Sequence, residues 1–151
     1  MMMRLIDINE ENWLKVIFLS TSKGMPTICE EFVASNALSI VQAQYEKTWT
    51  TKAIEKDGEI IGFTMYGYAK KHGYYELCRI MIDNKFQGNG YGTEALQLVI
   101  AEMKKIEDCK NIYLSTDSEN IKGKHIYEKF GFVNTGKFVD EEELYVLSLS
   151  E

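Results

Sequence analysis

Asp83-Asn84-Lys85-Phe86-Gln87-Gly88-Asn89-Gly90-Tyr91-Gly92-Thr93 is the stretch that decides the fold class of this chain. It follows Tyr74–Ile82, which has the composition of a β-strand, and it leads into a helical pattern. Glycines at alternate positions let a backbone approach a ligand closely and let several N–H groups point one way. Because the positive end of the helix dipole adds to these amides, the stretch predicts an anion site suited to a pyrophosphate.

Two other phosphate-binding loops are excluded by spacing. A P-loop needs Gly-Lys-Ser/Thr, whereas Gly92 is followed by Thr93-Glu94. A dinucleotide fingerprint needs GxGxxG, whereas this segment reads GxGxG after an antiparallel strand. The alternative that stays open on these residues alone is a glycine-rich turn without a ligand.

The rest of the chain predicts strands and helices on both sides of this loop. Asp57-Gly58 is the strongest hairpin signal, and Leu96, Val99, Ile100 and Met103 follow helical spacing after Gly90. We expect an α+β (mixed α/β) fold with the order β-α-α-β-β-β-α-β-α-β-β. The expected strands are Arg4–Ile8, Trp49–Glu55, Glu59–Tyr68, Tyr74–Ile82, Asn111–Ser115, Phe132–Phe138 and Glu143–Leu149, and the expected helices are Glu10–Leu19, Thr27–Ala43, a helix from Gly90 and Ile121–Phe130.

Composition narrows the function classes. The 151 residues predict a single domain, and a net charge of -6 argues against nucleic acid and favours a cationic or neutral ligand. No apolar run approaches the ~20 residues that span a bilayer, and no signal peptide is visible, so we expect a cytoplasmic protein with no membrane partner. Three cysteines and two histidines, with no CxxC, predict no structural metal. The sequence leaves a homodimer open.

Two motifs together resemble the GNAT acetyltransferases. Their signature Gln/Arg-x-x-Gly-x-Gly/Ala after a long strand is matched by Gln87, Gly90 and Gly92. Their second signature, an Asn followed by a helix ending in Tyr-x-x-x-Gly-Phe, is matched by residues 120–132. The order of elements also matches along nearly the whole chain. Within the family, residues 119–132 and 79–92 look most like bacterial spermine/spermidine acetyltransferases.

The resemblance implies the GNAT fold over residues 1–151, with a central, mostly antiparallel twisted sheet of about seven strands flanked by four helices. It implies acetyl-CoA as co-substrate and no metal. The pantetheine arm is expected to pair with the third antiparallel strand like an extra strand, and Asn120 is expected to contact that arm, to cap its helix, or to do both. The implied cofactor-binding residues are Ile80, Met81, Ile82, Gln87, Gly88, Asn89, Gly90, Tyr91, Gly92, Thr93 and Asn120.

Acetyl transfer to an amine needs an acid for the departing thiolate and a base for the attacking ammonium. Tyr127 stands where the family places its acid, although a tyrosine there can also be a core residue. Related polyamine enzymes often carry an acidic residue where this chain has Cys78. Glu76 lies two residues earlier, on the same strand face, so we predict Glu76 as the base and an acceptor ligand. A nucleophilic Cys78 is not expected, because direct transfer needs no acyl-enzyme.

The acceptor is the least constrained part of the sequence prediction. Glu31 is a candidate wall of an acidic acceptor pocket, whereas Asp140–Glu143 is predicted to be a solvated hairpin tip. The leading hypothesis is N-acetylation of a small-molecule primary amine, with a polyamine or diamine such as spermidine or spermine first. The alternatives are another small amine, an aminoglycoside, an amino acid or a protein N-terminus as acceptor, or a module that binds acetyl-CoA without catalysis.

Overall fold

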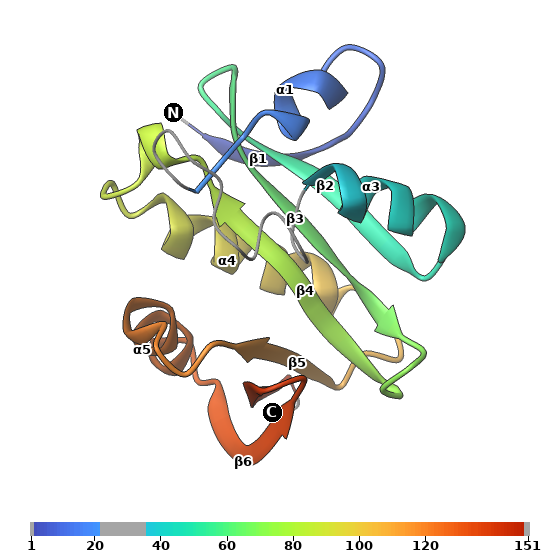
Figure 1. Ribbon diagram of the computed structural model, residues 1–151, viewed down its shortest axis with the longest axis vertical. Helices are drawn as coiled ribbons and strands as arrows, with labels where there is room; N and C mark the ends of the chain where they lie inside the picture. The colour runs from blue at the N-terminus through green and yellow to red at the C-terminus, as the bar shows by residue number, and fades with distance from the viewer. Residues whose placement is uncertain (1, 22–35, 150–151) are drawn as a thin grey trace.

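The computed structural model describes residues 2–21 and 36–149 and shows a mixed α/β fold around one seven-stranded sheet (Figure 1). In chain order the elements are β1 Met3–Asp7, α1 Trp13–Ile17, α3 Asn36–Tyr45, β2 Trp49–Lys56, β3 Glu59–Ala69, β4 Tyr74–Ile82, a 3-10 turn Asn84–Phe86, α4 Tyr91–Lys104, β5 Asn111–Thr116, α5 Ile121–Lys129, β6 Val133–Val139 and β7 Glu142–Ser148. The described part of the chain therefore has seven strands and four α-helices, as the sequence predicts.

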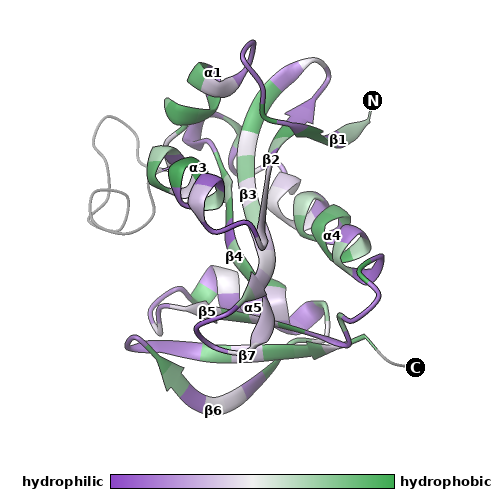
Figure 2. Cartoon of the chain, turned by 90° about the vertical axis from the view of Figure 1, so that its right-hand side faces the viewer, coloured by the Kyte–Doolittle hydropathy of each residue, from purple (hydrophilic) through white to green (hydrophobic). Residues whose placement is uncertain are grey.

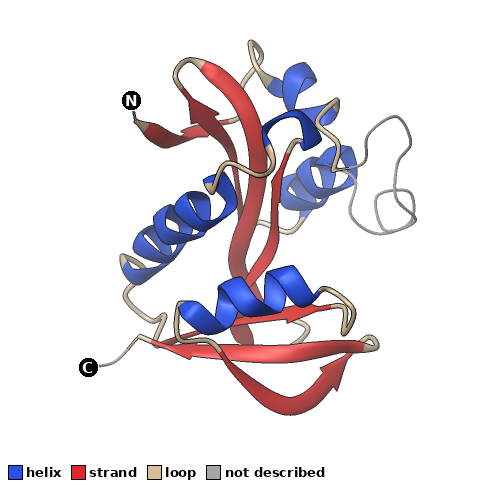
Figure 3. Ribbon diagram, turned by 90° about the vertical axis from the view of Figure 1, so that its left-hand side faces the viewer, coloured by secondary structure: helices blue, strands red, loops and turns tan. Residues whose placement is uncertain are grey.

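The sheet has the strand order β1-β2-β3-β4-β5-β7-β6. Every neighbouring pair is antiparallel except β4 and β5, which are parallel and paired only at Glu76 and Tyr113. Beyond that pair the two strands diverge, and β5, β7 and β6 cross beneath the long strands β2–β4 (Figures 1 and 3). The sheet is thus split into two wings that share one junction.

The helices cover opposite faces of the first wing, with α1 and α3 on one side and α4 on the other (Figure 2). The side chains predicted to line the inner face of α4 are buried, as expected: Leu96, Val99, Ile100 and Met103 are each at most 8% exposed. They pack with Phe132 and Tyr145 of the second wing. The apolar stripe of α4 therefore holds the two wings together beside their junction.

Most element boundaries fall within one or two residues of the prediction, and the first helix is the main error. Residues 9–12 form a turn, because the Asn9 side chain accepts hydrogen bonds from the amides of Glu11 and Asn12, at 2.8 and 3.1 Å. Helix α1 consequently begins at Trp13 and not at Glu10. The predicted start of the second helix at Thr27 lies outside the described residues, and its end is at Tyr45.

A β-bulge interrupts β4 close to the junction. Met65 of β3 pairs with Arg79, and the next residue, Tyr66, pairs with Leu77, so Cys78 is the extra residue. The fully buried Thr64 donates a hydrogen bond from its hydroxyl to the Arg79 carbonyl oxygen, at 2.8 Å. Bulges re-aim side chains and bend a strand, and here the bend separates β4 from β5.

Gly67 sets how closely the segment before β2 packs on β3. A Cβ atom at this position would lie 2.1 Å from the Thr48 carbonyl oxygen. Thr48 is tied to the same place by two hydrogen bonds, one from its hydroxyl to the Tyr68 carbonyl at 2.7 Å and one from the Tyr68 amide to its own carbonyl at 3.3 Å. Only glycine fits under this contact.

We therefore predict that Gly67→Ala lowers the free energy of unfolding by about 1–3 kcal/mol, because the added methyl group meets backbone that cannot move cheaply. Gly92→Ala is the matched control, since a Cβ there has nothing within 4 Å and alanine gains up to about 1 kcal/mol over glycine in a helix. Urea unfolding measures both. Equal stability of the two variants would contradict the contact.

Candidate active site

The glycine loop between the 3-10 turn and α4 is shaped by its own side chains. Gln87 donates from Nε2 to the Ile82 carbonyl at 2.9 Å, and Asn89 donates from Nδ2 to the Phe86 carbonyl at 3.0 Å. Gly88 and Gly90 have φ angles of 83° and 78°, in the left-handed region that favours glycine. Gln87 and Asn89 thus fix the loop conformation through their contacts with carbonyl groups.

The same loop leaves room for a ligand at the start of α4. Cβ atoms built on Gly88, Gly90 and Gly92 would have nothing within 4 Å. The first amides of a helix have no acceptor within the helix, and here they follow Gly90, which is the N-cap of α4. Tyr91 and Thr93 lie in this first turn; the Tyr91 ring stands 5.2 Å from the Lys56 ammonium. This arrangement fits an anion bound by backbone amides.

The predicted cofactor strand contributes its backbone rather than its side chains. Met81 packs towards α1 and α3, whereas Ile80 and Ile82 pack on the opposite face, towards α4. In the described sheet, no residue of β4 beyond Glu76 pairs with β5. The β5-facing edge around residues 80–82 is therefore available to pair with an extended ligand.

Glu76 and Tyr127 line one cavity of about 1080 Å³, which also meets Cys78, Arg79 and Ile80. It lies at the junction of the two wings, because β4, β5, α5 and the β6–β7 turn all contribute to its wall. The structure thus brings together residues that are 51 positions apart in the sequence. Glu76 and Cys78, which the sequence predicts to share one face of the strand, line the same cavity.

Burial raises the pKa of the Glu76 carboxyl above its ordinary value. His72 and Arg79 oppose that shift because their positive charge favours the carboxylate, whereas Glu142 and Asp140 add to it. A carboxyl group with a raised pKa is a stronger base when it is ionised. The environment of Glu76 therefore suits proton abstraction.

Cys78 is an unsuitable nucleophile. Burial is the largest cause that raises the pKa of its thiol to about 11, and the Arg79 charge opposes the shift only in part. The Arg79 Nη1 atom donates to the Cys78 carbonyl at 3.0 Å and lies 3.1 Å from its sulfur. At neutral pH the thiol is protonated, which is the unreactive form.

Tyr127 stands on α5 with its ring against the aromatic core. Its ring centroid lies 6.0 Å from that of Phe132 and 6.5 Å from that of Tyr145. Burial raises the pKa of the phenol, and the Glu142 charge adds to the shift. The ring of Tyr127 thus packs in the core, and the residue also lines the cavity. Its role as the acid stays a prediction.

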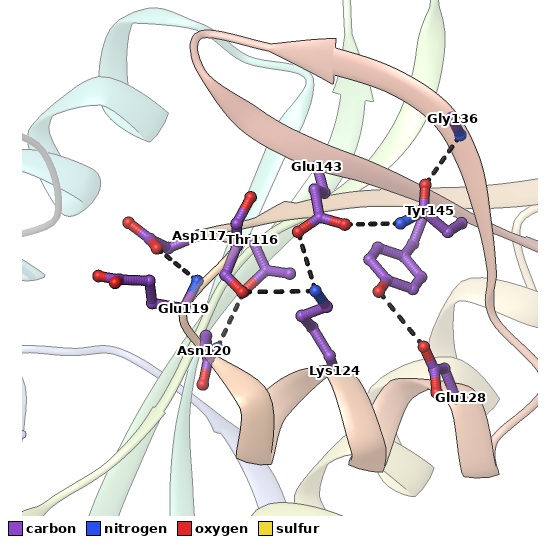
Figure 4. A network of polar contacts seen from close by, with 11 residues as sticks. Thr116, Asp117, Glu119, Asn120, Lys124, Glu128, Gly136, Glu143 and Tyr145 are labelled. Atoms are coloured by element: carbon purple, nitrogen blue, oxygen red, sulfur yellow. Dashed lines mark hydrogen bonds and ion pairs between the residues drawn. The ribbon is translucent and has the colours of Figure 1, made fainter.

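Helix α5 is held in place by polar contacts at its start and along one side (Figure 4). Asn120 caps the helix, accepting from the Gly123 amide at 3.1 Å and donating to the Thr116 hydroxyl at 2.9 Å. Lys124 pairs with Glu143 of β7 at 2.9 Å. The hydrogen bond between them is the largest cause that lowers the pKa of Glu143 and raises that of Lys124. These contacts fix the helix that carries Tyr127.

Gly123 leaves room for the side chain that caps α5. A Cβ atom at this position would lie 2.3 Å from the Asn120 Nδ2 atom. The capping conformation of Asn120 therefore depends on glycine three residues later. Of the two roles predicted for Asn120, the structure contains the helix cap.

The acidic tip predicted at Asp140–Glu143 is only half correct. Asp140 and Glu141 form the turn, with φ angles of 49° and 70°, and both line the cavity. Glu142 and Glu143 belong to β7 and are bound: Ser115 donates to Glu142 at 2.8 Å, and Asn134 donates to Glu143 at 2.7 Å. Both residues are partly buried and hydrogen-bonded because they belong to strand β7.

Several further sequence predictions can be compared with the structure. Glu31 lies outside the described residues. Within those residues, no group of three His, Cys, Asp or Glu side chains could hold a metal ion, and no helix is both long and apolar enough to cross a membrane. Glu46 and Trp49 line the cavity and were missed, because the residues between a helix end and a strand carry no local signal for a site.

Comparison with known proteins decides the family, since the model described as "Acetyltransferase (GNAT) family" matches residues 11–132. This chain is a member of the GNAT acetyltransferase family. A spermine/spermidine N(1)-acetyltransferase of Bacillus subtilis is 26% identical over 136 residues, which cover 86% of this chain and 87% of that protein.

Solved GNAT structures share the fold. A PaiA N-acetyltransferase of Thermoplasma acidophilum in complex with coenzyme A has a TM-score of 0.70 and 18% identity, covering 98% of this chain and 99% of that one. The aminoglycoside acetyltransferase AAC(6')-Ib, also with coenzyme A, has a TM-score of 0.75 and 18% identity, covering 98% and 95%. These two proteins therefore share the overall fold of this chain.

Proposed function

We propose that the protein is an acetyl-CoA-dependent N-acetyltransferase, working as one domain, that transfers acetyl directly to a primary amine, with a polyamine or diamine as the acceptor. The observation that carries the proposal is the position of Glu76 and Tyr127 on one cavity beside the open edge of β4. A base and an acid that face the same space are what amine acetylation needs.

Acetyl-CoA would be held at two places whose geometry fits it. The amides at the start of α4 would take the pyrophosphate, where Gly88, Gly90 and Gly92 leave open space. The edge of β4 around Ile80–Ile82 would pair with the pantetheine arm, and its N–H groups would stabilise negative charge on the carbonyl oxygen. Bound there, acetyl-CoA supplies an activated acetyl group as a thioester.

The chain's own residues handle the protons. Glu76 accepts a proton from the ammonium of the acceptor, which leaves a free amine to attack the carbonyl carbon. Tyr127 donates its phenolic proton to the sulfur as the carbon–sulfur bond breaks. The nitrogen loses a second proton as the amide forms, and this proton returns to the Tyr127 phenolate. One proton in total, the one on Glu76, is then released to solvent. Direct attack of the amine needs neither an acyl-enzyme nor the Cys78 thiol.

The acceptor class rests on charge and on relatives. The net charge of -6 favours cationic ligands, and the Bacillus subtilis relative is named for spermine and spermidine. A panel of acceptors with labelled acetyl-CoA tests the class: spermidine and spermine against an aminoglycoside, free amino acids and an N-terminal peptide. Faster transfer to any of the last three would replace the polyamine assignment, and no transfer at all would favour a binding module.

Gly92→Glu separates cofactor binding from folding. The variant should fold at least as stably as the parent, because the site is open and a carboxylate is favourable in the first turn of a helix. Its affinity for coenzyme A should fall more than about 100-fold, because the carboxylate would face the pyrophosphate. Calorimetric titration and thermal unfolding are the two measurements. A stable Gly92→Glu protein with parental affinity would remove the loop from the site.

Glu76 should control the acidic side of the pH–rate profile. Because burial raises its pKa above 4.5, kcat/KM should fall as the pH drops through that raised value, where the base becomes protonated. Glu76→Gln should lose about 10²–10⁴-fold in rate and lose this limb. Glu142→Gln is the matched variant. It removes a charge that raises the pKa of Glu76, so the acidic limb of its pH–rate profile should move to lower pH. A limb that stays unchanged in both would show that another group is the base.

Tyr127→Phe should lower the single-turnover rate about 10²–10⁴-fold while leaving coenzyme A affinity nearly unchanged, because it removes a proton donor and keeps the ring. Tyr145→Phe is the control, since that hydroxyl donates to Glu128 at 3.4 Å and its ring is buried in the core. Single-turnover kinetics with saturating acetyl-CoA is the measurement. Parental rates for Tyr127→Phe would mean that water or another residue protonates the thiolate.

A further inference from the structure

A line of three residues crosses the first wing of the sheet at the level of the active site. Trp49 of β2 pairs with Gly67 of β3, and Gly67 pairs with Glu76 of β4. Directly paired residues in antiparallel strands have their side chains on the same face, so Trp49 and Glu76 share a face. The Thr48 carbonyl oxygen fills the space beside Gly67 between them. Two strand spacings separate them, about 10 Å.

The residue bound to Trp49 is Glu46, in the connection between α3 and β2. Its carboxylate accepts a hydrogen bond from Trp49 Nε1 at 2.9 Å and another from Gln42 Nε2 at 3.0 Å. These bonds, Gln42 first, lower the pKa of Glu46. Both donors are neutral, so they hold the carboxylate in its ionised form without cancelling its charge.

Glu46 differs from two other hydrogen-bonded carboxylates, which form ion pairs. Glu55 pairs with Arg4, and Glu143 pairs with Lys124. Within residues 2–21 and 36–149, Glu46 has no such ion pair. A carboxylate that is fixed, ionised and not matched by a cation is an available site for a positively charged ligand.

The segment that carries Glu46 is rigidly placed. Thr48 is bonded to both backbone groups of Tyr68, and its carbonyl oxygen occupies the space left by Gly67. One oxygen of the Glu46 carboxylate accepts from both Gln42 on α3 and Trp49 on β2. A charge held in this way loses little conformational entropy when a ligand binds.

Glu46 and Glu76 line the same cavity. The charge of Glu46 is also among the causes that raise the pKa of the Cys78 thiol, two residues from Glu76. Three lysines stand on the rim, Lys47, Lys70 and Lys71. All three are exposed, as Glu46 is, so water and salt screen the charges of both signs. Glu46 differs from the lysines in being held by two hydrogen bonds on the cavity wall.

We infer that Glu46 is a specificity-determining residue, which binds the second ammonium group of a di- or polyamine whose first amine reacts at Glu76. The inference rests on the proposed function and deepens it. The acceptor would lie along the cavity wall from Glu46 to Glu76, with its methylene groups beside Thr48 and Trp49, which line the same cavity. A monoamine reaches Glu76 and leaves Glu46 without a partner, so the enzyme should prefer acceptors with a second positive charge.

Glu46→Gln tests this with spermidine and n-butylamine as acceptors. The amide keeps an oxygen for the Trp49 and Gln42 bonds and removes the charge. We expect kcat/KM for spermidine to fall about 10–100-fold, the range for losing a hydrogen bond to a charged group. For n-butylamine it should fall much less, so the ratio of the two values drops. Calorimetric titration should show the Kd of spermidine rising by a similar factor.

Glu107→Gln is the control for net charge. It removes the same charge from an exposed residue that does not line the cavity, and both acceptors should react at parental rates. Equal losses with both acceptors in Glu46→Gln would show a structural role and overturn the inference. So would an unchanged preference for spermidine, although the proposed function would then stand. A parent enzyme that acetylates neither amine would overturn both.

Discussion

The parallel contact between β4 and β5, limited to one residue pair, is the constraint on which the site depends. Glu76 and Tyr113 form that pair, and the stacked rings of Tyr74 and Tyr113, with centroids 4.3 Å apart, reinforce it. A longer parallel ladder would occupy the edge of β4 that an extended ligand could use. A missing contact would leave the two wings joined only by α4 and its apolar core. The single pair joins the two wings and leaves the rest of the β4 edge unpaired with β5.

The bulge at Cys78 follows from the same constraint. It comes two residues after the pair at Glu76 and changes the direction of β4 just where the strand leaves β5. The carbonyl of Arg79, next to the extra residue, accepts from the buried Thr64 hydroxyl, and the carbonyl of Cys78 itself accepts from Arg79 Nη1. As a result, Glu76, Cys78 and Arg79 all line the cavity, although strict alternation would turn successive side chains to opposite faces. The local distortion of the strand thus gathers the polar groups of the site.

The sequence predicts this fold well where local chemistry decides, and less well where distant residues meet. Asp57-Gly58 adopts the positive φ angles that a hairpin needs, and the spacing on α4 gives its buried face. The Asn9–Asn12 turn was missed because asparagine side chains compete with helix formation in a way that periodicity does not show. Glu46 could not be recognised, since its importance comes from strand register: Trp49, Gly67 and Glu76 align only through pairings across three strands. The bulge was also invisible, because no local pattern marks Cys78 as the extra residue.

Burial raises the pKa of both predicted catalytic groups, although one is predicted to accept a proton and the other to donate one. For Tyr127, burial and the Glu142 charge both raise the pKa, so the phenol keeps its proton until negative charge develops on a neighbouring atom. For Glu76, burial raises the pKa while His72 and Arg79 restrain the shift, so the carboxylate form persists as a strengthened base. Glu142 raises the pKa of both, and it comes from β7, in the other wing from β4. The proton balance of the cavity therefore depends on the distance between the wings, which the single β4–β5 pair sets.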